Sequence, residues 1–168
     1  QPGDLLIACA DMRGAYAGDS SNFPAFLNAP KERLRGDMEI LPELAEDGLV
    51  TAGKDISQGG IAGTALMLAE CSGVSITIDP NRIVPPDDDL RRWMTAFPSY
   101  GFLLTAKPEK AAAVLSRFHA RDIGAAVIGN VEGGSALSLT DGSTQHVIWD
   151  HEVAPYLGLA PIKELSHA

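Results

Sequence analysis

The residues best suited to chemistry lie in one short segment, KDISQGG, at residues 54–60. A carboxylate (Asp55), a hydroxyl (Ser57) and an amide (Gln58) follow closely on one another, and two glycines come directly after them. An apolar pattern typical of a helix begins at the second glycine. A polar turn that leads into a helix N-terminus attracts anions, because free backbone N–H groups and the positive end of the helix dipole face it. The segment therefore predicts a turn that can hold an anionic group.

Two interpretations of this turn compete. In the first, Asp55 and Ser57, two positions apart, present their oxygens to the same side of an extended turn and share a cation or a polar ligand. In the second, one of these side chains only caps the helix, and the glycines permit a tight turn into it. The residue types alone favour capping, since capping residues are common and short motifs are weak indicators of function.

The elements that would position the turn are a short strand before it and a helix after it. We predict the strand over residues 49–52 and the helix over about residues 60–71, with a stop at Ser72-Gly73. An earlier helix is predicted over residues 32–46, where Pro42 should kink or split it.

The rest of the chain alternates strand and helix patterns, which predicts one α/β (α+β) sandwich with a mixed sheet. Residues 11–31 are rich in Gly, Pro and Asp, and a loop of this length is usually functional or lies against a partner. The predicted strands are 5–10, 74–79, 102–105, 125–129, 136–139 and 145–149, and the further predicted helices are 90–96, 108–120 and, weakly, 152–157.

Composition and charge limit the classes of function. The 168 residues suit a single domain, residues 1–168, and the net charge of −9 argues against a nucleic-acid or anionic-membrane surface. No apolar stretch approaches the roughly 20 residues of a membrane span. Cys9 and Cys71 lie far apart in apolar sequence, which indicates buried, reduced thiols in a cytoplasmic protein. The chain enters its first strand directly after Gln1, without an initiator Met, so we expect one domain of a longer polypeptide.

Several of these features recur together in one known family. They are the turn at residues 54–60, the helix with Met67 and Glu70, the strand over residues 74–79 and the segment over residues 101–129. Over about residues 1–139 the chain resembles the C-terminal domain of the aminoimidazole ribonucleotide (AIR) synthetase superfamily. Relatives in that superfamily include thiamine-monophosphate kinase, selenophosphate synthetase and formylglycinamidine ribonucleotide synthetase. The match is nearest to AIR synthase-related members.

The resemblance implies a three-layer α/β/α fold, partly ferredoxin-like, and ATP-dependent chemistry with Mg²⁺. It places Asp55 as a magnesium ligand and reverses the preference for capping. Gln58 stands where several relatives carry a second aspartate, and a neutral amide is a poor ligand for a hard cation. The residues that it implies for ATP or phosphate binding are Lys54, Ser57, Gln58, Gly59 and Gly60.

The same resemblance implies partners outside this chain. An N-terminal domain, absent from this chain, would hold most of the ATP and magnesium, with a homodimer in the full-length protein. The isolated domain is therefore not expected to be active. The substrate is a small molecule that the sequence does not identify. Arg13, beside Asp11 after the first strand, is the best basic candidate for contacting it, and Ser99 and Tyr100 either form a turn or line its pocket.

The remaining polar and aromatic residues have simpler expected roles. Glu70 is expected at the surface or in a salt bridge, and the histidines have no zinc-site spacing. Trp93 and Trp149 are expected in the core or at a domain interface. Two functions remain: part of an ATP- and Mg²⁺-dependent enzyme that transfers or activates a phosphoryl group, or a non-catalytic ligand-binding or scaffold module that keeps the fold.

Overall fold

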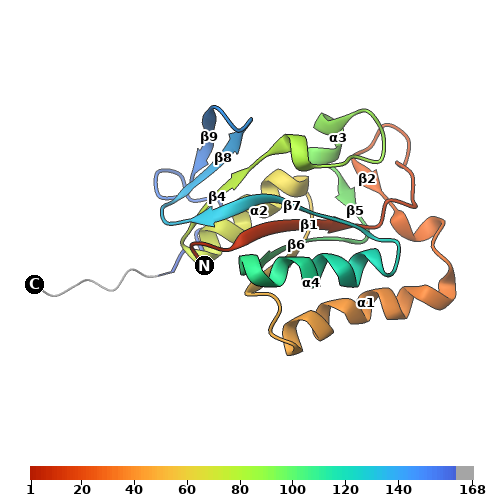
Figure 1. Ribbon diagram of the computed structural model, residues 1–168. Helices are drawn as coiled ribbons and strands as arrows, with labels where there is room; N and C mark the ends of the chain where they lie inside the picture. The colour runs from red at the N-terminus through yellow and green to blue at the C-terminus, as the bar shows by residue number, and fades with distance from the viewer. Residues whose placement is uncertain (162–168) are drawn as a thin grey trace, which may run out of the picture.

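A seven-stranded mixed sheet with helices on both faces forms the body of the protein (Figure 1). The structure is a computed structural model that describes residues 1–161. The strand order in the large sheet is β3-β6-β1-β7-β4-β8-β9, and β2 pairs with β5 in a small second sheet. The strands are β1 (Leu5–Ala10), β2 (Asn22–Phe23), β3 (Ala52–Asp55), β4 (Ser75–Ile78), β5 (Phe97–Pro98), β6 (Gly101–Ala106), β7 (Gly124–Glu132), β8 (Ala136–Thr140) and β9 (Gln145–Asp150). The helices are α1 (Lys31–Glu46), α2 (Gly60–Ser72), α3 (Leu90–Met94) and α4 (Pro108–His119), with short 3₁₀ turns at Ala25–Leu27 and Pro80–Arg82.

Strand β1 lies in the interior of the sheet. It pairs antiparallel with β6 on one side and with β7 on the other, so β6 and β7 run parallel to each other across it. Helix α4 connects these two strands. Leu6 and Ile7 point to opposite faces and are both fully buried, which explains why the strand is a continuous apolar run.

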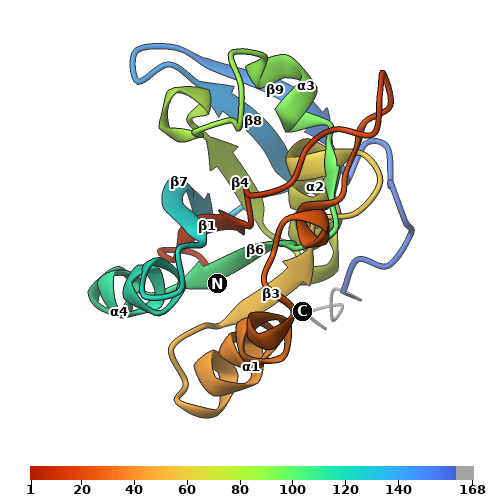
Figure 2. The same cartoon turned by 90° about the vertical axis from the view of Figure 1, so that its right-hand side faces the viewer.

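Two apolar cores lie on the two faces of the sheet. One core joins β1, β4 and β7 to α2 and α3, and the other joins β1 and β6 to α1 and α4. Figure 2 shows α1 and α4 on one side of the sheet and α2 on the other. The prediction of a three-layer α/β sandwich with a mixed sheet is confirmed.

Most predicted elements are present, with three local differences. The strand before the turn spans Ala52–Asp55, not residues 49–52, because its pairing with β6 runs from Ala52↔Thr105 to Asp55↔Phe102. Pro42 lies inside α1 without dividing it. Pro42 is exposed and has no N–H to donate to the backbone carbonyl one helical turn before it. Water can form that hydrogen bond instead. The predicted weak helix over residues 152–157 is wrong, since this segment forms turns.

One of the predicted burials is wrong. Cys71 is exposed, whereas Cys9 is buried as expected. Trp93 is 3% exposed and belongs to the core, as expected. Trp149 on the edge strand β9 is 40% exposed and lies outside the core, so its expected role at a domain interface stays a prediction. Within residues 1–161, no helix combines the length and the hydropathy that a membrane crossing requires.

Candidate functional site

The predicted turn lies at the edge of the sheet, between β3 and α2. Asp55 is the last residue of β3, and the Ile56 N–H donates to the Gly101 carbonyl of β6 at 2.8 Å. Ile56 and Ile61 are each 2% exposed and bracket the turn. The polar residues of the turn are therefore held in place by a buried isoleucine on each side.

Gly59 and Gly60 both need a backbone conformation that favours glycine, but only Gly60 also lacks space for a side chain. Both have positive φ angles, +91° at Gly59 and +63° at Gly60. A Cβ on Gly60 would overlap the Met94 carbonyl oxygen and lie 2.5 Å from the Thr95 Cα, whereas a Cβ on Gly59 would meet Gly63 at an ordinary 3.4 Å. A glycine is thus required at position 60 because the backbone of the α3–β5 connection packs directly against it. At position 59 there is space for a side chain.

Neither polar side chain of the turn caps the helix. The N-cap of α2 is Gly59, with no side-chain capping bond. The N–H of Ser57 donates to the buried Thr64 hydroxyl at 3.2 Å, and the Ser57 carbonyl accepts the Gly60 N–H at 2.9 Å. The capping interpretation is therefore wrong. Among the described residues, the N–H groups of Gln58 and Gly59 have no hydrogen-bond partner, which leaves donors free for a ligand.

Asp55 is accessible and already paired with a cation. Its side chain is 61% exposed, and its Oδ1 lies 3.0 Å from the Lys54 Nζ. A surface pair of this kind contributes only about 0–1 kcal/mol, so a stronger ligand can separate the two charges. Lys54 and Asp55 also line a groove of about 670 Å³ between β3, α1 and α2, which Met67 and Leu68 help to form. The turn thus opens onto space that solvent reaches.

Arg13 lies in a different cluster, where its donors are used within the protein. Its Nε and Nη2 each donate to Asp11 at 2.7 Å, and Nη2 also reaches Asp37 at 3.2 Å. The hydrogen bonds to Asp11 raise the pKa of Arg13 further above its usual range. Arg121 donates to the same Asp37 carboxylate, which is only 3% exposed. An anionic substrate would therefore compete with two carboxylates for Arg13.

Ser99 and Tyr100 lie next to this cluster and also make internal contacts. The Tyr100 hydroxyl donates to the Asp37 carbonyl at 2.6 Å, and burial raises the pKa of this phenol. The Ser99 hydroxyl accepts the Ala25 N–H at 2.9 Å. The structure brings Arg13 and Tyr100 together around Asp37, but it does not place them in the groove beside Asp55.

Glu70 was expected at the surface or in a salt bridge, and this prediction is wrong, because the residue is buried and its carboxylate is bound by backbone N–H groups. Glu70 is 0% exposed. Its carboxylate accepts the backbone N–H groups of Tyr156 at 2.6 Å, Leu157 at 3.0 Å and Leu159 at 2.8 Å. Burial acts to raise its pKa, but these hydrogen bonds outweigh it and lower the pKa. The signal in the sequence was its position between Ala69 and Cys71 in a helix without a charged face.

Asp11 and Asp37 are the other residues that sequence reasoning did not single out. Both are buried, and the Arg33–Asp37 spacing of four residues was the available signal. Asp11 and Arg13 are only two residues apart, but Asp37 meets Arg13 and Arg121 from distant parts of the chain, so only the fold shows the whole cluster.

Comparison with known proteins gives a consistent family. The model of the AIR synthase related protein C-terminal domain matches residues 1–142. The chain is 38% identical over 165 residues to an uncharacterised protein of Synechocystis sp. and 32% identical over 152 residues to one of Methanocaldococcus jannaschii. These matches cover 94% and 89% of the chain but only 50% and 47% of the relatives. The chain therefore spans about half the length of the curated relatives it matches.

Solved structures share the fold at low sequence identity. PurL of Thermotoga maritima in complex with ATP superposes with a TM-score of 0.72 at 14% identity, over 98% of this chain and 27% of that one. HypE of E. coli, a hydrogenase maturation protein, superposes with a TM-score of 0.65 at 17% identity, over 95% of this chain and 53% of that one. From the family match and the two relatives, the chain belongs to the AIR synthase-related family, and residues 1–142 match the C-terminal domain of that family.

Proposed function

We propose that this chain is the C-terminal domain of an AIR synthetase-like enzyme that uses ATP and Mg²⁺ to transfer or activate a phosphoryl group on a small substrate. The observation that carries the proposal is the free pair of backbone donors at Gln58 and Gly59, next to the exposed Asp55–Lys54 pair at the mouth of a groove. Phosphoryl transfer needs mainly positioning and charge compensation from the protein, and such a turn supplies part of both.

Each residue of the turn has a separate role in this proposal. The Gln58 and Gly59 N–H groups donate to phosphate oxygens, and Ser57 adds its hydroxyl. Lys54 leaves Asp55 and pairs with a phosphate. Gly60 allows the turn to pack against the α3–β5 connection, which fixes the direction of the Gln58 and Gly59 N–H groups.

Asp55 is suited to bind a magnesium ion that is also coordinated by the phosphates of a nucleotide. Mg²⁺ is usually held by one or two carboxylates together with substrate phosphates and waters, so a single exposed carboxylate beside a phosphate-binding turn suffices. Bound there, the ion would neutralise charge on the phosphates. Asp55 would hold it, and Gln58 would leave no second carboxylate on this turn.

The rest of the proposal concerns the part of the protein outside this chain. The relatives are about twice as long as the chain, and PurL of Thermotoga maritima has been solved with ATP, ADP and AMPPCP, which supports nucleotide use by a larger protein. An N-terminal domain would supply most nucleotide ligands, in a cytoplasmic homodimer. Arg13, Ser99 and Tyr100 would contact the substrate only after rearrangement of the Asp37 cluster.

Calorimetry on the full-length protein tests the role of Asp55. We expect ATP to bind only with Mg²⁺, and Asp55→Ala to weaken binding about tenfold, equivalent to about 1.4 kcal/mol. Asp88→Ala is the matched control, since Asp88 is an exposed aspartate in a loop away from the turn. Equal affinity of the parent and Asp55→Ala proteins would refute the role of the turn.

A second candidate function is a non-catalytic ligand-binding module. It is favoured by Gln58, which leaves the turn with Asp55 as its only carboxylate. For this function the same calorimetry would give nucleotide binding that is independent of Mg²⁺.

A further inference from the structure

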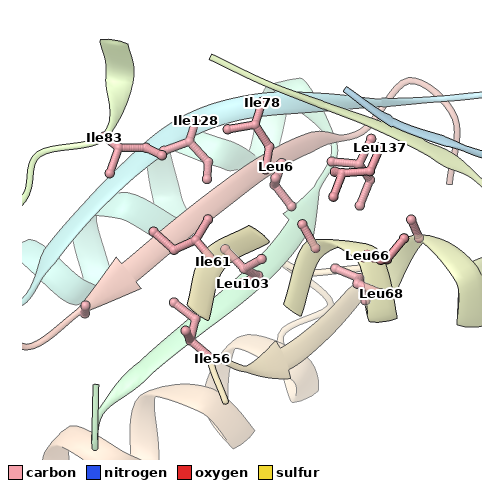
Figure 3. Packing of buried hydrophobic residues seen from close by; sticks show 14 of the residues in the cluster. Leu6, Ile56, Ile61, Leu66, Leu68, Ile78, Ile83, Leu103, Ile128 and Leu137 are labelled. Atoms are coloured by element: carbon pink, nitrogen blue, oxygen red, sulfur yellow. The ribbon is translucent and has the colours of Figure 1, made fainter. Parts of the chain in front are cut away.

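A second hollow lies on the other side of the turn, between the sheet and α2 and α3, and it is partly open to solvent. Its volume is about 230 Å³. Ile56, Ile61, Ile83 and Ile128 belong to one core cluster on this face of the sheet, and all four line the hollow (Figure 3). Trp93, only 3% exposed, forms another part of the wall. We call this hollow the core cavity.

The core cavity exists because two small residues meet on the floor of the sheet. Ala8 of β1 and Ala126 of β7 are direct cross-strand partners, and both line the core cavity. Residues directly opposite each other on neighbouring strands share one face, so this pair leaves a depression that larger side chains would fill. Leu6, two residues before Ala8 and on the same face of β1, is fully buried.

The walls of the core cavity are apolar, and their polar groups are mostly occupied. The Cys9 side chain lies in the core on the other face of the sheet, where its thiol donates to the Phe102 carbonyl at 3.5 Å, and the His119 Nε2 pairs with the Ala125 carbonyl at 2.9 Å. Apart from these two residues, Trp93 has the only other side-chain N–H or O–H group among the lining residues. A polar ring such as a purine would lose its hydrogen bonds to water here without replacement, which is unfavourable.

The core cavity has a path to solvent. Val84 is 66% exposed and His119 is exposed, and both line it. They come from the segment after the Pro80–Arg82 turn and from the end of α4. A small molecule can therefore reach the core cavity from its exposed rim.

We propose that the core cavity is a binding site for a small aromatic ring or branched aliphatic group. An apolar cavity of about 150 Å³ in another protein stays dry and binds benzene, so the core cavity has room for a substituted ring. This inference goes beyond the proposed function, since it needs neither nucleotide nor metal. Ile56 and Ile61 belong both to the cavity wall and to the flanks of the turn, so a bound group would lie directly behind the turn.

Tryptophan fluorescence tests the site directly. The chain has two tryptophans, so Trp149→Phe leaves Trp93 as the single reporter. The probe is iodobenzene, whose heavy atom quenches a neighbouring indole. We expect saturable quenching of Trp93 by iodobenzene and almost none by iodide ion, since Trp93 is shielded from water. Quenching that rises linearly with iodobenzene, without saturation, would overturn the proposal.

A variant that fills the core cavity gives the second arm of the test. Ala126→Leu should lower the affinity for iodobenzene at least about tenfold and keep a cooperative melting transition, because filling a cavity is commonly stabilising. Ala113→Leu, on the exposed side of α4, is the matched control and should bind like the parent. Unchanged binding by Ala126→Leu would place the probe elsewhere and overturn the site.

Methyl NMR on the unsubstituted chain decides the case if Ala126→Leu fails to fold. We expect nuclear Overhauser effects from the ring protons of iodobenzene to the methyl groups of Ile61 and Ile83, which face the core cavity from opposite walls. Their absence at saturating probe would overturn the proposal. Neither measurement involves ATP, so failure here leaves the role of Asp55 standing, and the reverse also holds.

Discussion

Replacing Gly60 by alanine should destabilise the protein more than any other single-methyl change in the turn. Gly60 has φ = +63°, a backbone conformation that residues other than glycine rarely adopt. A methyl group there would also lie 2.5 Å from the Thr95 Cα and overlap the Met94 carbonyl oxygen. Backbone atoms cannot rotate away as a flexible side chain would, so α2 or the α3–β5 connection must move.

The size of the effect follows from these two causes. A non-glycine residue in the left-handed region costs roughly 1–2 kcal/mol, and overpacking in a close-packed region adds about 1–3 kcal/mol. Gly60→Ala should thus lower the free energy of unfolding by roughly 3 kcal/mol, and for a protein of this size the melting temperature should fall by about 6–12 °C.

Gly59→Ala is the matched control, because it changes the same turn at φ = +91° but leaves 3.4 Å to the nearest backbone atom. It should carry only the conformational penalty of roughly 1–2 kcal/mol and lower the melting temperature by about 2–8 °C. Urea unfolding and thermal melts of both variants measure the difference. Equal losses in the two variants would refute the reasoning that Gly60 is glycine because of the α3–β5 backbone.

Two further predictions concern buried carboxylates. Asp37→Asn should lower the free energy of unfolding by about 3 kcal/mol, since it leaves arginines without their shared partner, while Glu39→Gln on the exposed side of α1 should be nearly neutral in the same urea titration. A loss no larger than that of the control would contradict the structural role of Asp37. Glu70→Gln should speed hydrogen exchange at the backbone amides of residues 156–159, and Glu46→Gln should leave it unchanged. Because the folded pKa of Glu70 lies below its usual value of 4.5, its stabilising contribution is fully present above that pH and is lost as the pH falls through the lowered pKa. Exchange at these amides that stays constant from neutral pH down through this range, after correction for the intrinsic rate, would contradict the carboxylate as their acceptor.

Short-range patterns in the sequence were enough to predict most elements. The unbroken apolar run at Leu5–Ala10 predicted a strand buried on both faces, and Pro108 predicted the first turn of α4. Helix α2 and its glycine stop were predicted to within a residue, because Gly73 adopts the left-handed conformation typical of a helix end. The predicted strand before the turn was misplaced by three residues, since β3 is short and its position depends on pairing with β6.

The polar turn was found from sequence, but the role of each residue in it was not. Residue types alone favoured a side-chain cap, whereas the structure has Gly59 at the cap position and uses Thr64 to bind the Ser57 N–H. Thr64 is seven residues further on, inside the helix, and no rule for capping would select it. The exposure of Asp55 and its pairing with Lys54 also depend on how β3 ends at the edge of the sheet.

The sequence by itself determined the α/β class, the order of the elements and the location of a polar turn, because these depend on hydrophobic periods and on residues a few positions apart. Only the tertiary structure decided which groups distant in the chain meet. It placed Arg13 and Arg121 on Asp37, fastened the backbone at residues 156–159 to Glu70, and set Ala8 against Ala126 to open the core cavity. Strand register and packing across the sheet set these contacts, and both are properties of the folded chain, in which each side chain is buried against partners that local sequence does not specify.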